Sequence, residues 1–578
     1  DGHQAPERAR QLRLGLRRRL AQLLLAGATL FFCRVAPVAG DTLLAMSLAD
    51  RSFQGVSASG DFETTPGRRQ LSDDGRWVVF QSQRGVLLVP GYSGAGEQLF
   101  LADRLTGIVR LVSAATGSTT QAANGRSILP ALNSDGRFVA FTSESTDLVA
   151  GVSGELAFNV YLWDRDAGPS SATRLVSHRT SGSLERGNDS SGDPDLSADG
   201  RYVAFESAAT DISGDAAEES SGVGTIQSYF WDGNAPPAEA TRRISHSSSS
   251  ASSPANDDVR NVVLSANGRY ATYSTAATDL VAGTSGETEE NVYIWDRDAP
   301  ALAGNRLVSH DAGGALVRGN RDSSEPRISN DGRYLVFRSL ATNLVAGAET
   351  NWRVNIYLWD REAAASESIR LVSHTPLSSP PTGGDGDSFD NRISGGGRFV
   401  TFTTSSTDLG PDPVRGLVHE FEPNPSGGGL YGLAGSGPPV PPPPPTNIYI
   451  WDRDAPTATA NQRVSIPDER EGDQHDVHAN ESVVSDDGRY VAYRSFTRDL
   501  TRGLPYPVLP PTDIFLWDRE APRPSAHRLV SHSTEGLAVS SNAEALQPAL
   551  SGDGSVVAFT STATDLVFGD LYFTDVFA

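Results

Sequence analysis

The sequence of 578 residues lacks lysine altogether and contains one cysteine and one methionine. Without lysine, neither a Schiff base nor a lysine general base can form, and arginine supplies all 48 strongly basic side chains. The cysteine, Cys33, lies in an amino-terminal segment that we expect to be removed. We therefore expect the mature chain to contain no disulfide, cysteine nucleophile or metal–thiolate site.

Long apolar runs are also missing. The apolar stretch Leu20 to Phe32 spans 13 residues, whereas a membrane-spanning helix needs roughly 20. It follows six arginines between positions 8 and 19 and precedes small residues at 38–40. This layout predicts a secretory signal peptide over residues 1–40, and hence a secreted or periplasmic protein with no membrane span in the mature chain. An uncleaved amino-terminal anchor and an acylated Cys33 are the alternatives.

Basic side chains are fewer than acidic ones. Acidic side chains outnumber them by 71 to 48, so the formal net charge is −23. Residues 1–40 carry seven arginines against Asp1 and Glu7, a net of +5, so their removal leaves −23 − 5 = −28. A surface this acidic repels nucleic acid and anionic membranes, so we expect neither as a partner.

One motif is present in abundance, typified by LSADGRYVAF at residues 196–205. Close copies recur from end to end, which predicts one repeat array rather than several unrelated domains. The eight copies are LSDDGRWVVF (from Leu71), LNSDGRFVAF (Leu132), LSADGRYVAF (Leu196), LSANGRYATY (Leu264), ISNDGRYLVF (Ile328), ISGGGRFVTF (Ile393), VSDDGRYVAY (Val484) and LSGDGSVVAF (Leu550).

Each copy is typical of two short strands, A and B, joined by a tight turn. The turn pair is mostly Asp-Gly, and such pairs accept the positive φ of a two-residue hairpin. Strand C recurs as NVYLWDRD (from Asn159), NVYIWDRD (Asn291), NIYLWDRE (Asn355), NIYIWDRD (Asn447) and DIFLWDRE (Asp513), and strand D as RLVSH (Arg174, Arg306, Arg370, Arg528). Strand C is apolar on both faces, which is typical of a propeller blade packed between two neighbours.

The turn glycines are 61, 64, 68, 64, 65, 91 and 66 residues apart, against roughly 40–50 in ordinary propeller blades. The A–B turns keep two residues, so the extra length lies in the B–C and D–A connections, which share one face of a four-stranded meander. The longest interval contains a Pro-rich insertion at 410–446, which predicts a flexible polyproline loop. One face is therefore expected to be loop-rich.

The two ends of the chain complement one another. The last unit stops in strand C at residues 575–578, and a strand of the missing kind is present at residues 42–47. Pairing these two strands would close the ring. We therefore predict that residues 41–578 form an all-β, eight-bladed β-propeller of four-stranded antiparallel blades, closed by pairing an amino-terminal strand with the last blade.

The S-x-D-G-R-Y-V-A-F core, followed by a (D/N)-(V/I)-(Y/F)-(L/I)-W-D strand, resembles the TolB-type WD40-like (PD40) β-propeller repeat. The resemblance covers residues 42–578 and implies the propeller fold. TolB proteins have six blades and a separate amino-terminal domain, so their cell-envelope role is not carried over. The repeats are also similar to the propellers of prolyl-oligopeptidase-type hydrolases, but the nearest nucleophile-elbow sequence, residues 91–95, lacks its final glycine.

Residues that recur in every blade are explained by what every blade needs, so function is expected where blades differ. The position before the Leu or Ile of strand A varies and is expected to line the central channel. Its members are Gln70, Ala131, Asp195, Val263, Arg327, Arg392, Val483 and Ala549. Asp195, Arg327 and Arg392 are the candidate ligand-binding residues, able to orient a carboxylate or a sugar; a neutralising channel network is the alternative.

Two D–A connections carry possible metal ligands. The first holds Asp473, His475, Asp476, His478 and Glu481. Its His-x-x-His pair fits Zn²⁺ or Mn²⁺ if both rings turn inward, and a solvated polar loop is the alternative.

The second connection carries the acidic run Asp385, Asp387 and Asp390, which suggests Ca²⁺ but lacks the full ligand series of a calcium loop.

Five histidines end strand D and are expected to be spread around the rim: His178, His246, His310, His374 and His532. We therefore expect no cofactor. A bound Ca²⁺ or transition metal is the alternative, with His475, Asp476 and His478 as candidates.

These observations together predict an exported, monomeric, non-catalytic propeller that binds a protein or polysaccharide through its loop-rich face. No catalytic residue is assigned. The alternatives are an enzyme, such as a polysaccharide lyase or glycosidase with a central metal or carboxylate site, and a propeller that is one domain of a longer surface protein.

Overall fold

The computed structural model describes residues 70–566 except 84, 155, 215–224, 377, 411–445, 467–477, 497–499, 501–511, 523–524 and 538. It also describes the backbone of residues 30–34, 43–45, 60–61 and 575–577. Most of the expected signal peptide and almost all of the Pro-rich insertion lie outside these residues. Both therefore stay predictions.

Seven four-stranded antiparallel sheets and one five-stranded sheet form the eight blades of the described chain. Blade 1 contains β3 (Gly60–Asp61), β4 (Trp77–Ser82), β5 (Gln98–Asp103) and β6 (Ile108–Leu111). Blade 2 contains β7 (Ser127–Leu132), β8 (Phe138–Ser143), β9 (Asn159–Asp164) and β10 (Thr173–Leu175), and blade 3 contains β11 (Ser191–Leu196), β12 (Tyr202–Ser207), β13 (Gln227–Asp232) and β14 (Thr241–Arg243). Blade 4 contains β17 (Val259–Leu264), β18 (Tyr270–Thr275), β19 (Asn291–Asp296) and β20 (Asn305–Leu307).

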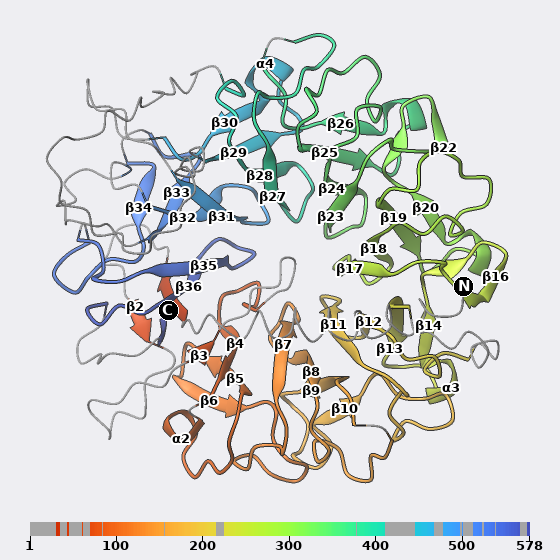
Figure 1. Cartoon of the computed structure of the whole chain (residues 1–578). Helices are drawn as coiled ribbons and strands as arrows, with labels where there is room; N and C mark the ends of the chain where they lie inside the picture. Colours follow the sequence, from red (N-terminus) through yellow and green to blue (C-terminus); the bar gives the residue numbers. More distant parts are fainter. Residues whose placement is uncertain are drawn as a thin grey trace, which may run out of the picture.

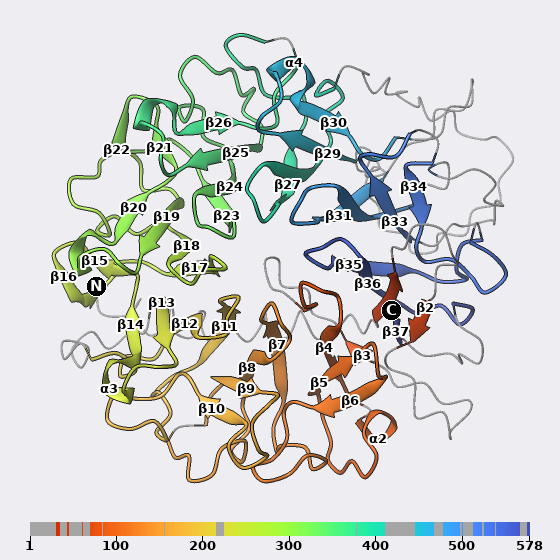
Figure 2. The same cartoon turned by 180° about the vertical axis from the view of Figure 1, so that it is seen from behind.

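Blade 5 contains β23 (Ser323–Ile328), β24 (Tyr334–Ser339), β25 (Asn355–Asp360) and β26 (Ile369–Leu371). Blade 6 contains β27 (Ser388–Ile393), β28 (Phe399–Thr404), β29 (Asn447–Asp452) and β30 (Asn461–Arg463). Blade 7 contains β31 (Ala479–Val484), β32 (Tyr490–Ser495), β33 (Asp513–Asp518) and β34 (His527–Leu529). Blade 8 contains β35 (Ala545–Leu550), β36 (Val556–Ser561) and β37 (Asp575–Phe577), with β1 (Leu30–Arg34) and β2 (Leu43–Ala45). In blades 2 to 8, strand A lies innermost, around a common centre (Figures 1 and 2).

Each A–B turn is built on a glycine that two independent effects require. All eight turn glycines have a positive φ, between 64° and 74°. A Cβ on each would also lie 1.9–2.5 Å from the first residue of strand B in the preceding blade. Gly136 meets Trp77 in this way, and Gly75 of blade 1 meets Val556 of blade 8. The same contact therefore runs around the complete ring and joins its two ends.

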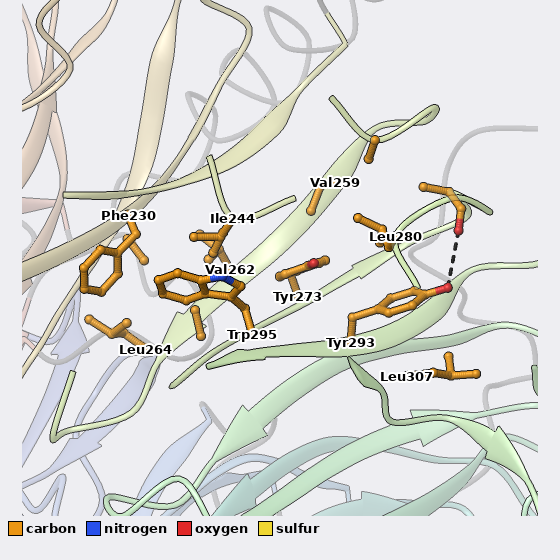
Figure 3. Close-up of a cluster of buried hydrophobic side chains, with 14 of the residues drawn as sticks. Phe230, Ile244, Val259, Val262, Leu264, Tyr273, Leu280, Tyr293, Trp295 and Leu307 are labelled. Atoms are coloured by element: carbon orange, nitrogen blue, oxygen red, sulfur yellow. Dashed lines mark hydrogen bonds between the residues drawn. The ribbon is translucent and has the colours of Figure 1, made fainter. Parts of the chain in front are cut away.

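The hydrophobic cores lie between blades rather than within them. As predicted, strand C is covered on both faces: Tyr161 and Trp163 pack with blade 1, whereas Val160 and Leu162 pack with blade 3. Figure 3 shows the equivalent core between blades 3 and 4, where the rings of Phe230 and Trp295 have centroids 5.1 Å apart. Each blade thus depends on its neighbours for burial of its apolar faces.

The last blade packs against the first, as the sequence predicts. One core cluster combines Val78 and Phe80 of blade 1 with Val556 and Ala558 of blade 8. The amino-terminal strand β2 pairs antiparallel with β37 and completes blade 8 (Figures 1 and 2). Strand β1, which falls inside the expected signal segment, pairs antiparallel with β36. Pairing through β2 does not depend on residues 1–40.

The repeated Arg and Asp residues form a bidentate ion pair inside each of seven blades. In blade 3, Arg201 donates two hydrogen bonds of 2.8 Å to Asp232. Burial acts to raise the pKa of Asp232, but the bonds from Arg201 and from the backbone of Asn234, together with the charges of Arg201 and Arg297, outweigh it and the pKa is lowered. The other pairs are Arg76–Asp103, Arg137–Asp164, Arg269–Asp296, Arg333–Asp360, Arg398–Asp452 and Arg489–Asp518. We call these pairs the blade clamps.

Two other repeated features also belong to the scaffold. In five blades an arginine follows Trp-Asp and stacks on an aromatic ring of the preceding blade, as Arg297 does on Tyr202 at 4.5 Å. The Thr-Asp-Leu motif forms a local turn, in which Asn256 donates to Thr278 and Asp279 accepts the backbone N–H of Asn256, above the buried Leu280. The repeated residues are therefore committed to structure, as expected.

Helices are few and short in the described chain: α2 (Gly85–Leu88), α3 (Pro237–Ala240), α4 (Thr457–Ala460), η2 (Ala301–Ala303) and η3 (Ala365–Glu367). Two small hairpins leave the outer edge of the ring, β15 (His246–Ser247) with β16 (Ser250–Pro254) and β21 (His310–Asp311) with β22 (Gly314–Arg318). No helix in the described residues is long and apolar enough to cross a bilayer.

Candidate functional site

A cavity of about 430 Å³ lies at the centre of the ring, between the strands A of different blades. Its size falls within the range of ordinary small-molecule sites. The polar and charged residues that line it are Gln70, Asp73, Asp195, Arg327, Asn330, Asp390, Arg392, Glu481, Asp486 and Gln547. All three candidate ligand-binding residues, Asp195, Arg327 and Arg392, lie at this cavity.

A β-bulge recurs in strand A just before the candidate positions. The register of strand A against strand B shifts there in blades 2 to 8. In every one of these bulges a non-glycine residue has φ between 53° and 60°: Leu129, Asp193, Asn261, Glu325, Asp390, Glu481 and Gln547. Such a conformation costs about 1–3 kcal/mol each and is concentrated at functional sites. Three of these side chains, Asp390, Glu481 and Gln547, line the cavity.

Asp195 is held by backbone N–H groups of two blades. Its carboxylate accepts hydrogen bonds from Leu196 (2.9 Å) and from Leu264 of the next blade (2.7 Å). These two bonds link strand β11 to strand β17. Asp195 therefore has a demonstrated structural role in addition to its place at the cavity.

Arg327 is a deeply buried cation with little to neutralise it. Arg327 is only 6% exposed, one Nη donates to the carbonyl of Pro326 at 2.7 Å, and Nε has no hydrogen-bond partner among the described residues. Burial and, to a lesser degree, the neighbouring Arg392 lower its pKa to about 9, although Glu325, Asp195 and Asp390 act to raise it. Among the described residues it makes no ion pair within 4.0 Å. Its guanidinium is therefore available to a ligand.

Arg392 occupies the same position in the next blade. Its Nη1 donates to the carbonyl of Asn391 at 3.0 Å, and the described residues offer it no ion pair either. Burial lowers its pKa, which Asp390, Glu325 and Glu481 act to raise. The two neighbouring strands β23 and β27 thus bring two uncommitted guanidiniums to one cavity.

The carboxylates at the cavity differ in how far they are committed. Glu481 accepts a hydrogen bond of 2.9 Å from Arg494 and another of 3.0 Å from the backbone of Gln547 in the next blade. Asp390, at φ 53°, makes no hydrogen bond within the described part of the chain. Among the described residues, the cavity therefore offers two free cations and two free acceptors, the carboxylate of Asp390 and the Oε1 of Gln547. This arrangement is suited to a polar ligand with both acidic and hydrogen-bond-donating groups.

The bulge residues are the part of the site that sequence reasoning missed. Sequence reasoning indicates Asp390 only as a possible Ca²⁺ ligand and Glu481 only as a neighbour of a His-x-x-His pair. It does not single out Gln547. Their shared position, three residues before the Leu, Ile or Val of strand A, was visible in the aligned repeats. In a simple alternating strand this position lies on the same face as the candidate position two residues later. The bulge shifts the pairing between the two positions, and alternation along the strand does not predict that shift.

The metal candidates receive no support as a group. His475 and Asp476, with Asp473, lie outside the described residues. His478 packs edge-on against Phe496, with centroids 6.4 Å apart. In the part of the chain that the structure describes, no group of three or more His, Cys, Asp or Glu side chains is placed to hold a metal ion.

The acidic run at 385–390 is spread over separate contacts. Asp385 accepts hydrogen bonds from Thr407, Asp387 accepts one from the backbone of Val354 at 3.0 Å, and Asp390 lies at the cavity. The three carboxylates therefore do not converge on one point.

The five rim histidines have a common structural role. The Nδ1–H of each donates to the carbonyl of the following residue at 2.8–3.2 Å. Burial lowers the pKa of His178, His310 and His374. As predicted, they belong to different blades and share no site.

The B–C and D–A connections meet on one face, as the sequence predicts. They are joined by parallel bridges at Ser93–Gln121, Ser153–Glu185, Ser285–Val317, Glu349–Thr382 and Thr446–His478. We call this surface the loop-rich face. Of eleven large apolar side chains that are exposed in the described chain, eight lie in these connections: Val86, Leu156, Leu184, Leu316, Val317, Trp352, Phe496 and Leu537.

Trp352 is the most conspicuous of them. It is 69% exposed, and both it and Asn351 have positive φ, 55° and 52°. A bulky side chain in this conformation is unusual and costs free energy. The strained backbone thus presents an aromatic ring to the solvent.

No family model and no curated protein matches the chain. Among solved structures, it is similar to prolyl oligopeptidase B from Galerina marginata, with 10% identity and a TM-score of 0.42 over 81% of this chain and 49% of that one. The chain is also similar to a solved prolyl endopeptidase structure, with 13% identity and a TM-score of 0.40 over 79% of this chain and 48% of that one. The chain thus spans about half the length of the prolyl peptidases that it matches.

The β-propeller domain of the Trilobed protease from Pyrococcus furiosus is also similar, with 10% identity and a TM-score of 0.36 over 80% of this chain and 96% of that domain. These neighbours share the propeller fold with the chain. The blade count and the ring closure rest on the strand pairings of the chain itself.

Proposed function

We propose that the chain is an exported, monomeric, non-catalytic propeller that binds a protein or glycan partner through its loop-rich face. The observation that carries the proposal is the gathering of exposed apolar side chains on that face, with Trp352 held on strained backbone. Exposed apolar groups of this kind mark interaction surfaces, and Trp contributes more than most residues to binding energy.

The perturbed carboxyl groups do not support acid–base catalysis in the central cavity. A catalytic acid needs a raised pKa at the place where the substrate binds. Burial raises the pKa of Glu290 and of Asp408. Neither residue lines the central cavity.

The partner class is tested by binding of the purified full-length chain to an array of neutral and acidic glycans and to secreted proteins. Trp352→Ala is expected to weaken binding by about tenfold or more, as for an interface aromatic. Leu105→Ala is the matched control, because Leu105 is 67% exposed but lies in a C–D turn. Equal losses in the two variants would contradict binding through the loop-rich face.

The proposed absence of catalysis is tested with the polysaccharides that bind to the protein. We expect no new reducing ends or unsaturated products, with or without a chelator. Turnover that is lost in Asp390→Asn or on chelation would favour the lyase or glycosidase alternative. Export is tested separately: amino-terminal sequencing of the secreted protein is expected to begin at Asp41.

A further inference from the structure

We propose that the central cavity is a binding site for a small hydroxylated monocarboxylate, whose carboxylate is held between Arg327 and Arg392. This site is separate from the loop-rich face, so it does not rest on the partner proposed above. The starting observation is Arg327, which is 6% exposed, lies at the cavity and has an Nε without a hydrogen-bond partner in the described part of the chain.

A buried arginine without an ion pair is costly to the folded protein. Removing a charged group from water costs several kcal/mol, and the structure normally supplies a partner that offsets this cost. Each of the seven blade clamps supplies such a partner within 3.0 Å. Among the residues that the structure describes, Arg327 and Arg392 donate hydrogen bonds only to the carbonyls of Pro326 and Asn391. The missing partner is therefore expected to be a bound anion.

The neighbouring carboxylates limit the charge of that anion. Asp195, Glu325 and Asp390 all act on Arg327, and they would repel a dianion such as phosphate more strongly than a monoanion. Guanidinium groups hold a planar carboxylate through paired N–H donors. A monocarboxylate therefore fits the site better than a phosphate or sulfate.

The remaining polar groups indicate what else the ligand carries. Asp390 accepts no hydrogen bond from the described residues and lies at the same cavity, as does Gln547. A carboxylate acceptor is satisfied by hydroxyl donors. The cavity of about 430 Å³ also exceeds what a simple acid such as acetate would fill. A sugar-sized acid with several hydroxyl groups satisfies both conditions.

The probes are sodium gluconate, acetate, phosphate and neutral glucose, titrated into the full-length chain by calorimetry at one ionic strength. Gluconate is expected to bind with a Kd of about 1 mM or below, acetate more weakly, and glucose and phosphate not measurably. Phosphate binding as tight as gluconate, or an absence of binding by both carboxylates, would overturn the proposal.

Variants locate the site. Arg392→Gln and Arg327→Met are each expected to weaken gluconate binding by about tenfold or more, since each removes a charge-assisted hydrogen bond. Asp390→Asn keeps a side chain that tolerates the left-handed backbone. It is expected to weaken gluconate binding without weakening acetate binding. Equal loss of both ligands in Asp390→Asn would overturn the assignment of hydroxyl groups to that side.

A stability measurement separates a binding role from a structural one. Without ligand, Arg327→Met is expected to raise the midpoint of thermal unfolding by about 2 °C or more, because it removes an unpaired buried charge. Arg186→Met is the matched control: Arg186 is 4% exposed, but it donates to Tyr161 and Ser145, so its loss is expected to lower the midpoint. A lowered midpoint in both variants would show that Arg327 is part of the scaffold.

Discussion

At the scale of single residues, this protein separates the positions that build the ring from those that differ between blades. The turn glycines, the blade clamps and the rim histidines repeat and have their partners within the scaffold. Arg327 and Arg392 occupy one position of strand A and Asp390 occupies the bulge position, and the residue type at both positions differs from blade to blade. Substitutions in the first group should change stability, and those in the second should change binding.

The A–B turn of blade 6 offers a matched pair of glycines. Gly397 has φ 69°, and a Cβ on it would lie 2.4 Å from the Tyr334 ring, whereas a Cβ on Gly396 would meet nothing within 4 Å. Gly397→Ala is expected to lower the free energy of unfolding by about 1–3 kcal/mol. Gly396→Ala should change it by less than about 0.5 kcal/mol. Urea unfolding checks both values, and similar effects would show that the ring contact is unimportant.

The rim histidines predict a pH dependence of stability. Burial lowers the pKa of His178, His310 and His374 in the folded chain, so the unfolded chain takes up protons more readily, from about pH 6.5 downward. Their contribution to stability is therefore full above pH 6.5 and is lost as the pH falls through the folded pKa values. Urea midpoints at pH 8, 6.5 and 5.5 measure the loss. His310→Gln should make it smaller, and an unchanged slope would contradict this origin.

At the scale of elements, strand A is the part of each blade that is shaped for the centre of the ring. Its β-bulge places a left-handed, non-glycine residue near the channel in seven blades. In blades 1 to 7, strands B and C are regular and pair over six residues, as β12 and β13 do. The irregular strand faces the cavity, and the regular strands carry the cores between the blades.

The blade clamp is an element-scale device that a double-mutant cycle can measure. We expect Arg201→Gln and Asp232→Asn to be coupled by about 1 kcal/mol, because the bonds are bidentate but the Arg201 side chain is 40% exposed. Urea unfolding of the wild type, both single variants and the double variant gives the coupling energy. No coupling, or a loss of gluconate binding in these variants, would contradict a purely structural role.

At the scale of the whole molecule, the ring is completed by residues from both ends of the chain. A chain that begins at residue 41 keeps β2 and is expected to unfold at nearly the same temperature as the full-length chain. A chain that begins at residue 48 lacks β2 and should unfold at a lower temperature, with faster hydrogen exchange in β36 and β37. Equal midpoints for the two shortened chains would contradict closure by β2.

Most of this architecture could be predicted because it repeats. Eight copies of one motif determine the blade count, the hairpins and the face on which long connections gather, since each copy tests the interpretation of the others. The channel positions of Arg327 and Arg392 followed from the same alignment. The bulge at Asp390 did not, because a bulge depends on how strand A pairs with strand B rather than on alternation along either strand. The hydrogen bond that Leu264 donates to Asp195 could not be predicted either, because Leu264 belongs to the neighbouring blade.

The contact between Gly75 and Val556 has a consequence for how the protein folds. It joins residues 556 − 75 = 481 positions apart, whereas Trp77 and Gly136 are separated by only 59. Chain entropy grows with the logarithm of loop length, so closing the ring costs about 2 kcal/mol more than adding one blade to the next. That difference is small beside a buried core between blades, but such long-range contacts slow the search for the native state. We therefore expect ring closure to limit the rate of folding far more than it limits the final stability.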